Sequence, residues 1–455
     1  MARRKISRKA TTPKGFIRRL QDADFGSVPE PRREASIRHP LVGLLKLGVL
    51  GMATGARSTR AVENRSEQLR PTIRADFGLE ARVSDNAFGL ALQQLDPVEL
   101  RRALHRQTKA EWRRGNLRPE SGPLPWSTVA IDGKHLATIP EKRLRALISK
   151  RTGLEGGELS PSELKRVAGT QFPYMQVFGS KPGELEGRVR AHRATLISGG
   201  ACVALDQWPI RGETNEKGAI RQALGGLFSA YGATTMIEMV TLDAGMSHPD
   251  IAEKIREHGA QYFLALKSPQ GELYRRARRQ LGSRPGREAS FEKRLEERGQ
   301  MIWYTVWTES LEESVGWEDA RQIVRIERVV ADDEEASVGE RYFVTSLGPE
   351  KLDAEQAWRL ARAHWRCENE GHWTADAIWE EDARRTPWTQ HPDGVLVVGL
   401  LRAIAINILA LLRELSWLKR GDTWVTPTWR TVIEQALLVL CEPLLEMSAF
   451  NGLRH

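Results

Sequence analysis

The chain has 455 residues, which is enough for two or three domains with a full hydrophobic core. Its 68 lysine and arginine residues outnumber its 59 acidic residues, and the net charge of +9 favours a polyanionic partner, although other basic soluble proteins exist. The three cysteines, Cys202, Cys367 and Cys441, are far apart and show no paired zinc-binding spacing. This pattern fits a reducing cytoplasm, and no secretory signal is recognisable.

Residues 1–34 form a basic arm that contains prolines, and we expect this arm to be flexible. Eight lysines and arginines fall in the first twenty residues, MARRKISRKATTPKGFIRRL, with no acid among them. Two interpretations stay open: the arm contacts phosphates of a nucleic acid, or it is a disordered tail that keeps the protein soluble. A mitochondrial presequence would normally be richer in serine and leucine.

Residues 35–118 are predicted to form a helical domain associated with DNA. The stretch RHPLVGLLKLGVLGMATGARSTRAVENR indicates a helix, a glycine break and a second helix that starts at Ser58. The domain ends in RRALHRQTKAEWRRGNLR, a basic helix that either lies along DNA or is a solvated face. The following PESGPLP, residues 119–125, has the composition of a linker.

Two apolar runs raise the question of a membrane. LVGLLKLGVLGMATGA is short and contains Lys46 and several glycines, and GVLVVGLLRAIAINILALL contains Arg402 and Asn407. We therefore predict two buried helices and no membrane partner.

From Trp126 onwards the pattern alternates between strands and helices. STVAID predicts a short strand that ends at Asp132, and TLISGGACVAL predicts two strands around a Gly-Gly hairpin. An amphipathic helix follows, and then the strand MIEMVTLD, which ends at Asp243. The capped helix HPDIAEKIREHG and the strand QYFLALK, which ends at Lys267, complete the series.

Two segments interrupt or extend this series. Residues 141–190 are charged and are expected to be rich in loops, whereas residues 269–350 alternate like antiparallel strands, with the acidic ADDEEASVGE as a turn. One long helix is then predicted from about Asp353 to Arg385. An apolar helix at 394–415 and a helical tail at 416–455 complete the chain.

The stretch HWRCENEGHWTADAIWEED places polar residues at every fourth position. On a regular helix His364, Glu368, His372 and Asp376 form one stripe. Such a stripe is often a solvated face, but the flanking tryptophans and the small or apolar neighbours indicate that it enters a cleft.

Asp132 and Asp243 each follow an apolar strand, and ligand sites of open α/β sheets lie beyond such strand ends. Each aspartate alone is more often a loop residue. Their order, with Asp132 on the first strand, a hairpin, a helix, Asp243 on the fourth strand and Glu368 on a late helix, is the connectivity of the RNase H-like fold. We therefore predict an α/β domain at 119–415: an RNase H-like mixed sheet flanked by helices, with a β-rich insertion.

Three converging carboxylates repel one another at neutral pH, and divalent cations relieve that repulsion. Mg²⁺ prefers oxygen ligands and suits a phosphate substrate, and Mn²⁺ should substitute for it. Two ions about 4 Å apart can serve an in-line displacement at phosphorus. Asp132, Asp243 and Glu368 are thus the predicted catalytic and metal-binding residues.

Several motifs resemble the DDE transposases of bacterial insertion sequences, in particular the H-repeat-associated (ISAs-type) group. They are IDGK at 131–134, ETNEKGAIRQALGGL at 213–227, TLDAGMSHPDIAEKIREHGAQYFLALKSPQGELY at 241–274 and HWRCENEGHWTADAIWEEDARR at 364–385. The resemblance runs from about residue 20 to 413. It implies that Asp132, Asp243 and Glu368 bind Mg²⁺, cut the ends of a transposon and join the freed 3′-OH to target DNA.

The chain departs from this family pattern in four places, one of which is a longer insertion at 141–190 than the family leads us to expect. His135-Leu136-Ala137 replaces the usual Thr and Arg after IDGK, and RGQMIW replaces a His-Gly-Arg signature in the β-rich region. Ala361, His364 and Ala375 stand where the wider superfamily often has Tyr, Arg and Lys. The three acids are intact, whereas recognition of DNA ends is open.

Other side chains near the acids are predicted to contact DNA. Stacking of a tryptophan on an unpaired base is worth roughly 1–3 kcal/mol. The alternatives are ordinary surface lysines, pairing on the helix surface, core packing of the tryptophans and a structural histidine. The predicted set is Lys134, Lys267, Trp365, Arg366, Asn369, His372, Trp373, Arg384 and Arg385.

Three functions remain open from the sequence. The first is an active transposase in the cytoplasm, at the nucleoid, acting on double-stranded DNA as a homo-oligomer. The second is a domesticated DNA-binding protein or nuclease derived from one. The third is a zinc hydrolase that uses His364, Glu368 and His372, which would leave both aspartates unused.

Overall fold

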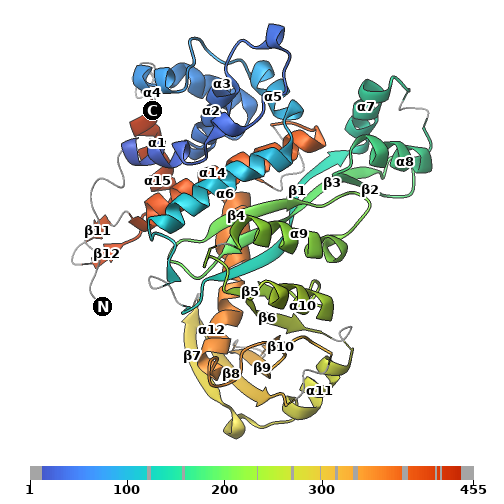
Figure 1. Cartoon of the computed structure of the whole chain (residues 1–455), viewed down its shortest axis with the longest axis vertical. Helices are drawn as coiled ribbons and strands as arrows, with labels where there is room; N and C mark the ends of the chain where they lie inside the picture. Colours follow the sequence, from blue (N-terminus) through green and yellow to red (C-terminus); the bar gives the residue numbers. More distant parts are fainter. Residues whose placement is uncertain are drawn as a thin grey trace, which may run out of the picture.

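The computed structural model describes residues 13–119, 124–155, 159–232, 234–267, 271–297, 299–312, 316–331, 337–381, 388–415, 418–420 and 423–441. The first helices of the chain lie at one end of the molecule, a mixed sheet forms its middle, and a β-rich extension lies at the other end (Figure 1).

One mixed sheet positions the candidate site. Within the described ranges ten strands join in the order β2-β3-β1-β5-β6-β10-β9-β8-β7, and β4 pairs with β3. β1 is parallel to β5 and β5 to β6, whereas β3 is antiparallel to β1 and β4, which is the predicted RNase H-like arrangement. The strands are β1 (Thr128–Pro140), β2 (Met175–Phe178), β3 (Glu186–Leu196), β4 (Val203–Pro209), β5 (Met239–Leu242), β6 (Gln261–Leu266), β7 (Phe291–Glu297), β8 (Gln300–Ser310), β9 (Gln322–Ala331) and β10 (Ser337–Thr345).

β1 continues beyond Asp132, so the prediction that the strand ends there is wrong. The pairing with β3 runs on from Asp132 to Pro140, because buried side chains keep alternating along this part of β1. The predicted hairpin between β3 and β4 is confirmed. The helices α9 (Glu216–Tyr231) and α10 (Pro249–Glu257) pack their apolar faces against the strands β1, β5 and β6.

The segment 141–190 is largely regular structure, contrary to the expectation of loops. It forms α7 (Glu141–Thr152), α8 (Pro161–Gln171), β2 and the start of β3. Each of these helices buries a narrow stripe, Leu144 with Ile148 and Leu164 with Ala168, against the outer part of the sheet. The sequence looked like a loop because charged residues cover the remaining faces.

The β-rich segment extends the sheet, as its alternating pattern predicts. β10 pairs with β6, and β9, β8 and β7 follow as antiparallel neighbours. α11 (Gly271–Leu281) covers one face and α12 (Ala354–His364) covers the other. Part of the predicted acidic turn, residues 332–336, lies outside the described residues, and β9 and β10 pair on either side of it.

α14 (Pro392–Leu415) joins the helical part of the molecule to the sheet. It packs against α2, α5 and α6 on one side and against β4 on another. It is the one helix in the described part of the chain that is long and apolar enough to cross a membrane, and its most apolar stretch is wholly buried inside the protein. The other helices of the helical part are α2 (Leu41–Ala53), α3 (Thr59–Gln68), α4 (Pro71–Asp76), α5 (Asp85–Gln94), α6 (Pro97–Arg113) and α15 (Trp429–Leu440), with the 3₁₀ turns η2 (Phe25–Ser27) and η3 (Glu34–Ser36). The short strands β11 (Leu418–Arg420) and β12 (Thr423–Val425) pair with each other after α14. The 3₁₀ turn η6 (Gly286–Glu288) lies in the β-rich segment between α11 and β7.

The predicted flexible arm is folded from residue 13 onwards. α1 (Pro13–Gln21) buries Phe16 and Leu20 in the core of the helical part. Arg19 is 1% exposed and its Nε lies 3.3 Å from a carboxylate oxygen of Glu111 on α6. The composition suggested disorder because basic residues surround this apolar pair. Residues 1–12 lie outside the described residues.

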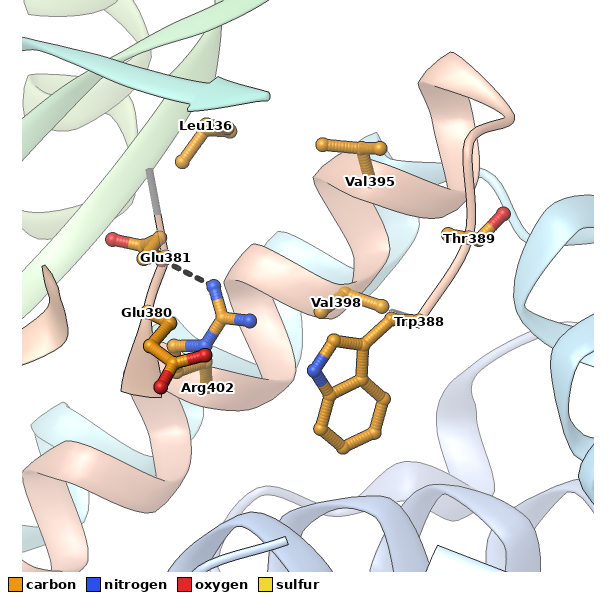
Figure 2. A pocket seen from close by; sticks show the side chains of 8 residues that line it. All are labelled: Leu136, Glu380, Glu381, Trp388, Thr389, Val395, Val398 and Arg402. Carbon is orange, nitrogen blue, oxygen red and sulfur yellow. Dashed lines mark hydrogen bonds and ion pairs between the residues drawn. The ribbon is translucent and has the colours of Figure 1, made fainter. Parts of the chain in front are cut away.

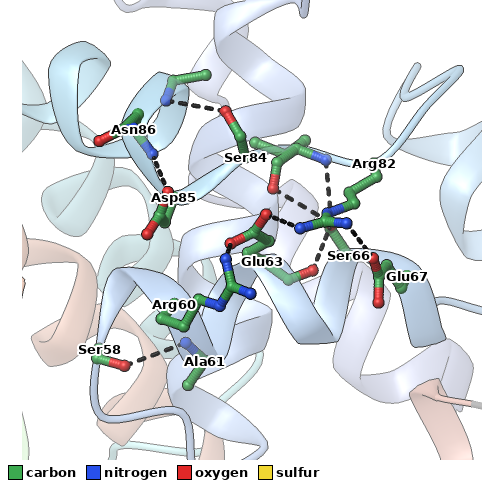
Figure 3. Close-up of polar contacts among 12 residues, drawn as sticks. Ser58, Arg60, Ala61, Glu63, Ser66, Glu67, Arg82, Ser84, Asp85 and Asn86 are labelled. Carbon is green, nitrogen blue, oxygen red and sulfur yellow. Dashed lines mark hydrogen bonds and ion pairs between the residues drawn. The ribbon is translucent and has the colours of Figure 1, made fainter.

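The predicted helix start at Ser58 is confirmed, because the Ser58 side chain caps α3 by accepting from the Ala61 N–H. Figure 3 shows the contacts that continue from this helix. The buried Glu63 carboxylate pairs with both Arg60 and Arg82, which ties α3 to the chain before α5. These arginines are therefore held by a carboxylate of the same domain.

The basic helix α6 is largely packed against other parts of the protein. Arg101 pairs with the buried Asp206 of β4, and Arg106 donates to the carbonyl oxygens of Ala23 and Asp24. α6 also packs along α14. Arg101 thus holds α6 on the sheet, and Arg106 holds it on the chain after α1.

Candidate active site

Asp132 and Asp243 lie at the same level on neighbouring parallel strands. The last paired residues of β1 and β5 are Ile131 and Leu242, and each directly precedes an aspartate. The Gly133 N–H donates to Asp132 Oδ1 at 2.8 Å. Asp243 is exposed at the carboxyl end of β5, where ligand sites of such sheets lie.

Glu368 comes from a π-helical turn, and the predicted single helix from Asp353 to Arg385 is wrong. After α12 the residues Cys367–His372 form the π-helical turn η7, and α13 spans Trp373–Trp379. Single π-helical turns inside α-helices are rare and frequent at functional sites.

Contacts with the sheet accompany the widened turn. Cys367 is fully buried in the cluster beneath η7. Arg366 donates to the carbonyl oxygens of Ile197, Gly199 and Gly200 in the β3–β4 hairpin, at 2.6, 3.0 and 3.0 Å. Across such a turn the regular step of 100° no longer holds, so the predicted four-residue stripe does not keep one environment.

The three acids share one electrostatic environment. Burial, followed by the nearby carboxylate of Glu368, raises the pKa of Asp132 to about 7, and Asp243 and Glu216 act in the same direction. The N–H of Gly133 opposes this rise. Since a like charge raises a carboxyl pKa only when it is near, Glu368 and Asp243 lie in the neighbourhood of Asp132.

The three acids do not form a finished metal cage. Among the described residues, no three His, Cys, Asp or Glu side chains are grouped closely enough to hold a metal ion. The donor set is nevertheless all oxygen, which suits a hard divalent cation. Asp243 and Glu368 are exposed, so their side chains have room to change rotamer.

The two histidines of the predicted stripe contact the sheet. His364 Nδ1 lies 2.8 Å from the Thr241 hydroxyl, and His372 Nδ1 lies 3.4 Å from Asp132 Oδ2. Burial lowers the pKa of His364 to about 4 and that of His372 to about 3, so both are neutral at pH 7. Both histidines are engaged by the sheet, and the described residues show no metal-ligand group that joins them to Glu368, so the structure adds no support to the zinc alternative.

Two family models match this chain. The Transposase DDE domain matches residues 197–407, and the DDE_Tnp_1-associated domain matches residues 23–108. The first range contains Asp243 and Glu368, and the second covers most of the helical part. The chain belongs to the DDE transposase family. The first range begins after Asp132, so the assignment of Asp132 to the site rests on the pairing of its strand, β1, with β5.

Two relatives of the transposase carry matching names. "Putative transposase YncI" of Escherichia coli O157:H7 is 23% identical over 403 residues, which cover 84% of this chain and 85% of the relative. "H repeat-associated putative transposase YhhI" of Escherichia coli strain K12 is 26% identical over 184 residues, which cover 38% of this chain and 47% of the relative. They support the H-repeat-associated group that the motifs indicated.

The transposase exposes part of the predicted DNA-contacting set beside the acids. Trp365 and Trp373 are 37% and 60% exposed, so neither is a core residue. Asn369 is exposed on η7, and Lys267 is exposed at the end of β6. Contact of these side chains with DNA stays a prediction. Arg384 and Arg385 lie outside the described residues.

Lys134, Arg366 and His372 are engaged by partners inside the transposase, and their contact with DNA stays a prediction. Lys134 is 4% exposed and its Nζ donates to both carboxylate oxygens of Asp376. Arg366 holds the hairpin carbonyls, and His372 is buried beside Asp132. A sequence shows that these groups are polar but not which partner they meet.

Sequence reasoning missed two charged neighbours of the acids. The Glu216 carboxylate lies against Gly133, and Glu216 belongs to the motif at 213–227, which was the available signal. Arg341 of β10 lies over the Trp365 ring at 4.0 Å, within electrostatic reach of Asp243 and Glu368. Its place in an ordinary alternating strand offered no signal.

Proposed function

We propose that this transposase cuts phosphodiester bonds at the ends of a DNA element and joins the freed 3′-OH to target DNA, with Asp132, Asp243 and Glu368 as its catalytic acids. The observation that carries the proposal is the parallel pairing of β1 with β5, in which Asp132 and Asp243 directly follow the last paired residues, Ile131 and Leu242. Glu368 is near enough to Asp132 to add to the rise in its pKa that burial causes. The family supports the coarser statement that the chain is a DNA-cutting and DNA-joining enzyme.

The three acids would hold Mg²⁺, with Mn²⁺ as a substitute, because both ions take carboxylate oxygens. The bound ions would polarise the phosphodiester and lower the pKa of the attacking oxygen. Asp132 is fixed by the Gly133 N–H and lies beside His372, so it is the stationary ligand. Asp243 and Glu368 are exposed, and we propose that they close towards Asp132 when DNA and cation bind.

The test is cleavage of DNA that carries the element ends, with wild type and Asp132→Ala, Asp243→Ala and Glu368→Ala. We expect each change to lower cutting by more than about 100-fold. A residue that only supports a metal ligand already costs about 10- to 100-fold, and loss of the ligand itself should cost more. DNA binding should persist, because affinity comes mainly from lysine and arginine contacts with phosphates.

The matched control for this test is Glu253→Ala, which removes an exposed acid on α10, a helix that carries none of the three acids. Wild-type cutting by any one of the three acid variants would remove that residue from the site. Cutting without joining would favour the alternative of a nuclease derived from a transposase.

We also infer that the transposase works in the cytoplasm, at the nucleoid, as a dimer or larger assembly. Its substrate is chromosomal double-stranded DNA, and two element ends must be held together during joining. The net charge of +9 supports a polyanionic partner.

A further inference from the structure

A buried network of ion pairs lies next to Asp132, between β1, β3 and the chain around α13. Its five members come from five places in the chain: Lys134 of β1, Arg193 of β3, Asp376 of α13, Glu381 just after α13, and Arg402 of α14. The side chains of Lys134, Arg193, Glu381 and Arg402 are at most 6% exposed, and that of Asp376 is 28% exposed.

Each charge in this network is met by an opposite charge. Lys134 Nζ lies 2.5 and 2.6 Å from the two carboxylate oxygens of Asp376, and 3.9 Å from Glu381. Arg193 donates to Glu381 at 2.9 Å, and Arg402 donates to it at 3.0 Å (Figure 2). Glu381 is thus held by cations from β1, β3 and α14.

The space beside Glu381 is too small for a ligand. The cavity that it lines with Arg402 and Trp388 measures about 10 Å³, about enough for a single water. The carboxylate is therefore balanced by the protein's own cations. Burial by itself would raise the pKa of Glu381, but Arg193, Arg402 and Lys134 outweigh burial and lower it.

Some members of the network are neighbours of Asp132 on the sheet, and others follow Glu368 in the chain. Lys134 follows Asp132 by two residues, so both side chains lie on the same face of β1. Arg193 is the residue of β3 that pairs with Asp132. Asp376 and Glu381 follow Glu368 in the chain, and Glu380, with φ 53°, turns the chain after α13.

We propose that Lys134, Asp376 and Glu381 are positioning residues that hold the segment 368–381 against β1 and so keep Glu368 beside Asp132. This inference rests on the proposed function for the role it gives Glu368. Buried ion pairs add little net stability compared with apolar packing, but their geometry is specific. A ligand displaced by about 1 Å can cost on the order of 100-fold in rate.

The test compares Asp376→Asn and Lys134→Met with Glu380→Gln. Glu380 is the chain neighbour of Glu381 but forms an ion pair on the surface with Arg57, where both side chains are about half exposed. Hydrogen exchange of residues 365–381 reports how firmly the segment is held, and single-turnover cutting reports its effect on chemistry.

We expect Asp376→Asn and Lys134→Met to speed hydrogen exchange in this segment and to lower the single-turnover cutting rate by on the order of 100-fold. The DNA concentration that gives half of the maximal rate should stay unchanged. Lys134→Arg, which keeps the charge, should recover part of the rate. Glu380→Gln should match wild type in both measurements.

Unchanged exchange in Asp376→Asn would overturn the proposal, and so would faster exchange with an unchanged cutting rate. If Lys134→Met does not fold, Asp376→Asn decides, because its side chain is partly exposed and asparagine keeps its size. If wild type does not cut DNA, the proposed function fails, while the exchange comparison still reports on the network.

Discussion

Gly133 follows Asp132 without ending the strand. The sequence suggested that the strand ends at Asp132, but β1 continues and Gly133 pairs with His192 of β3. A Cβ on Gly133 would lie 2.5 Å from Glu216 Cδ, so the missing side chain gives the Glu216 carboxylate its place. The sequence correctly predicted that Asp132 and Asp243 are neighbours, because strand order decides this. It could not predict Glu216, because that contact depends on how α9 packs on β1.

For Gly133→Ala we expect the free energy of unfolding to change by less than about 1 kcal/mol. The clash would involve the end of a flexible, 44% exposed side chain, which can swing into solvent. Urea denaturation measures the change, with Glu216→Ala/Gly133→Ala as the control that removes the clash. A loss above about 2 kcal/mol in the single variant alone would mean that Glu216 cannot move.

At the scale of an element, the π-helical turn around Glu368 is a feature that the spacing of residues in the sequence could not predict. The four-residue spacing selected residues that contact the same part of the sheet: His364 contacts Thr241, His372 contacts Asp132, and Asp376 pairs with Lys134. Glu368 acts on the pKa of Asp132. The spacing could not show the π-helical turn, because the contacts of Arg366 with the hairpin carbonyls join distant parts of the chain. Spacing along one helix carries no information about that hairpin.

β4 is tied to α6 by a buried carboxylate. Asp206 accepts from Arg101 Nε at 2.8 Å and lies 3.2 Å from His105 Nε2. Burial alone would raise the pKa of Asp206, but hydrogen bonds from His105 and Arg101 outweigh burial and hold it at about 2. Because the folded pKa is depressed, this stabilisation is present above about pH 4 and is lost as the pH falls towards 2.

For Asp206→Asn we therefore expect the free energy of unfolding to fall by about 3 kcal/mol at pH 7, since the buried Arg101 loses its charged partner. The difference from wild type should shrink between pH 4 and pH 2, as wild type loses the same charge. Urea denaturation at pH 7, 4 and 3 measures it, with the exposed Asp250→Asn as control. A difference that does not vary with pH would contradict the assigned pKa.

On the scale of the whole molecule, one core serves segments that the sequence separated. Side chains from α1, α2, α5, α6, α14 and α15 share a single apolar cluster. Composition marks boundaries near residues 35, 119 and 416, and these domain limits stay predictions. Composition could not show the shared core, because an apolar helix such as α14 does not reveal which partners cover its different faces.

The predicted assembly belongs to the same scale. With two DNA ends bound, we expect mass photometry to show complexes with at least two chains of 51.2 kDa each. The protein without DNA, at the same concentration, is the control that shows whether assembly depends on the ends. A complex with both ends on one chain would contradict the prediction.

The position of α14 near the end of the chain has a consequence for biosynthesis. During translation the helices of the first hundred residues leave the ribosome long before residues 392–415 are made. Their apolar faces cannot be fully covered until that helix emerges, because α14 packs against α2, α5 and α6. Final folding of these first helices is therefore a late event that waits until residues 392–415 have been synthesised.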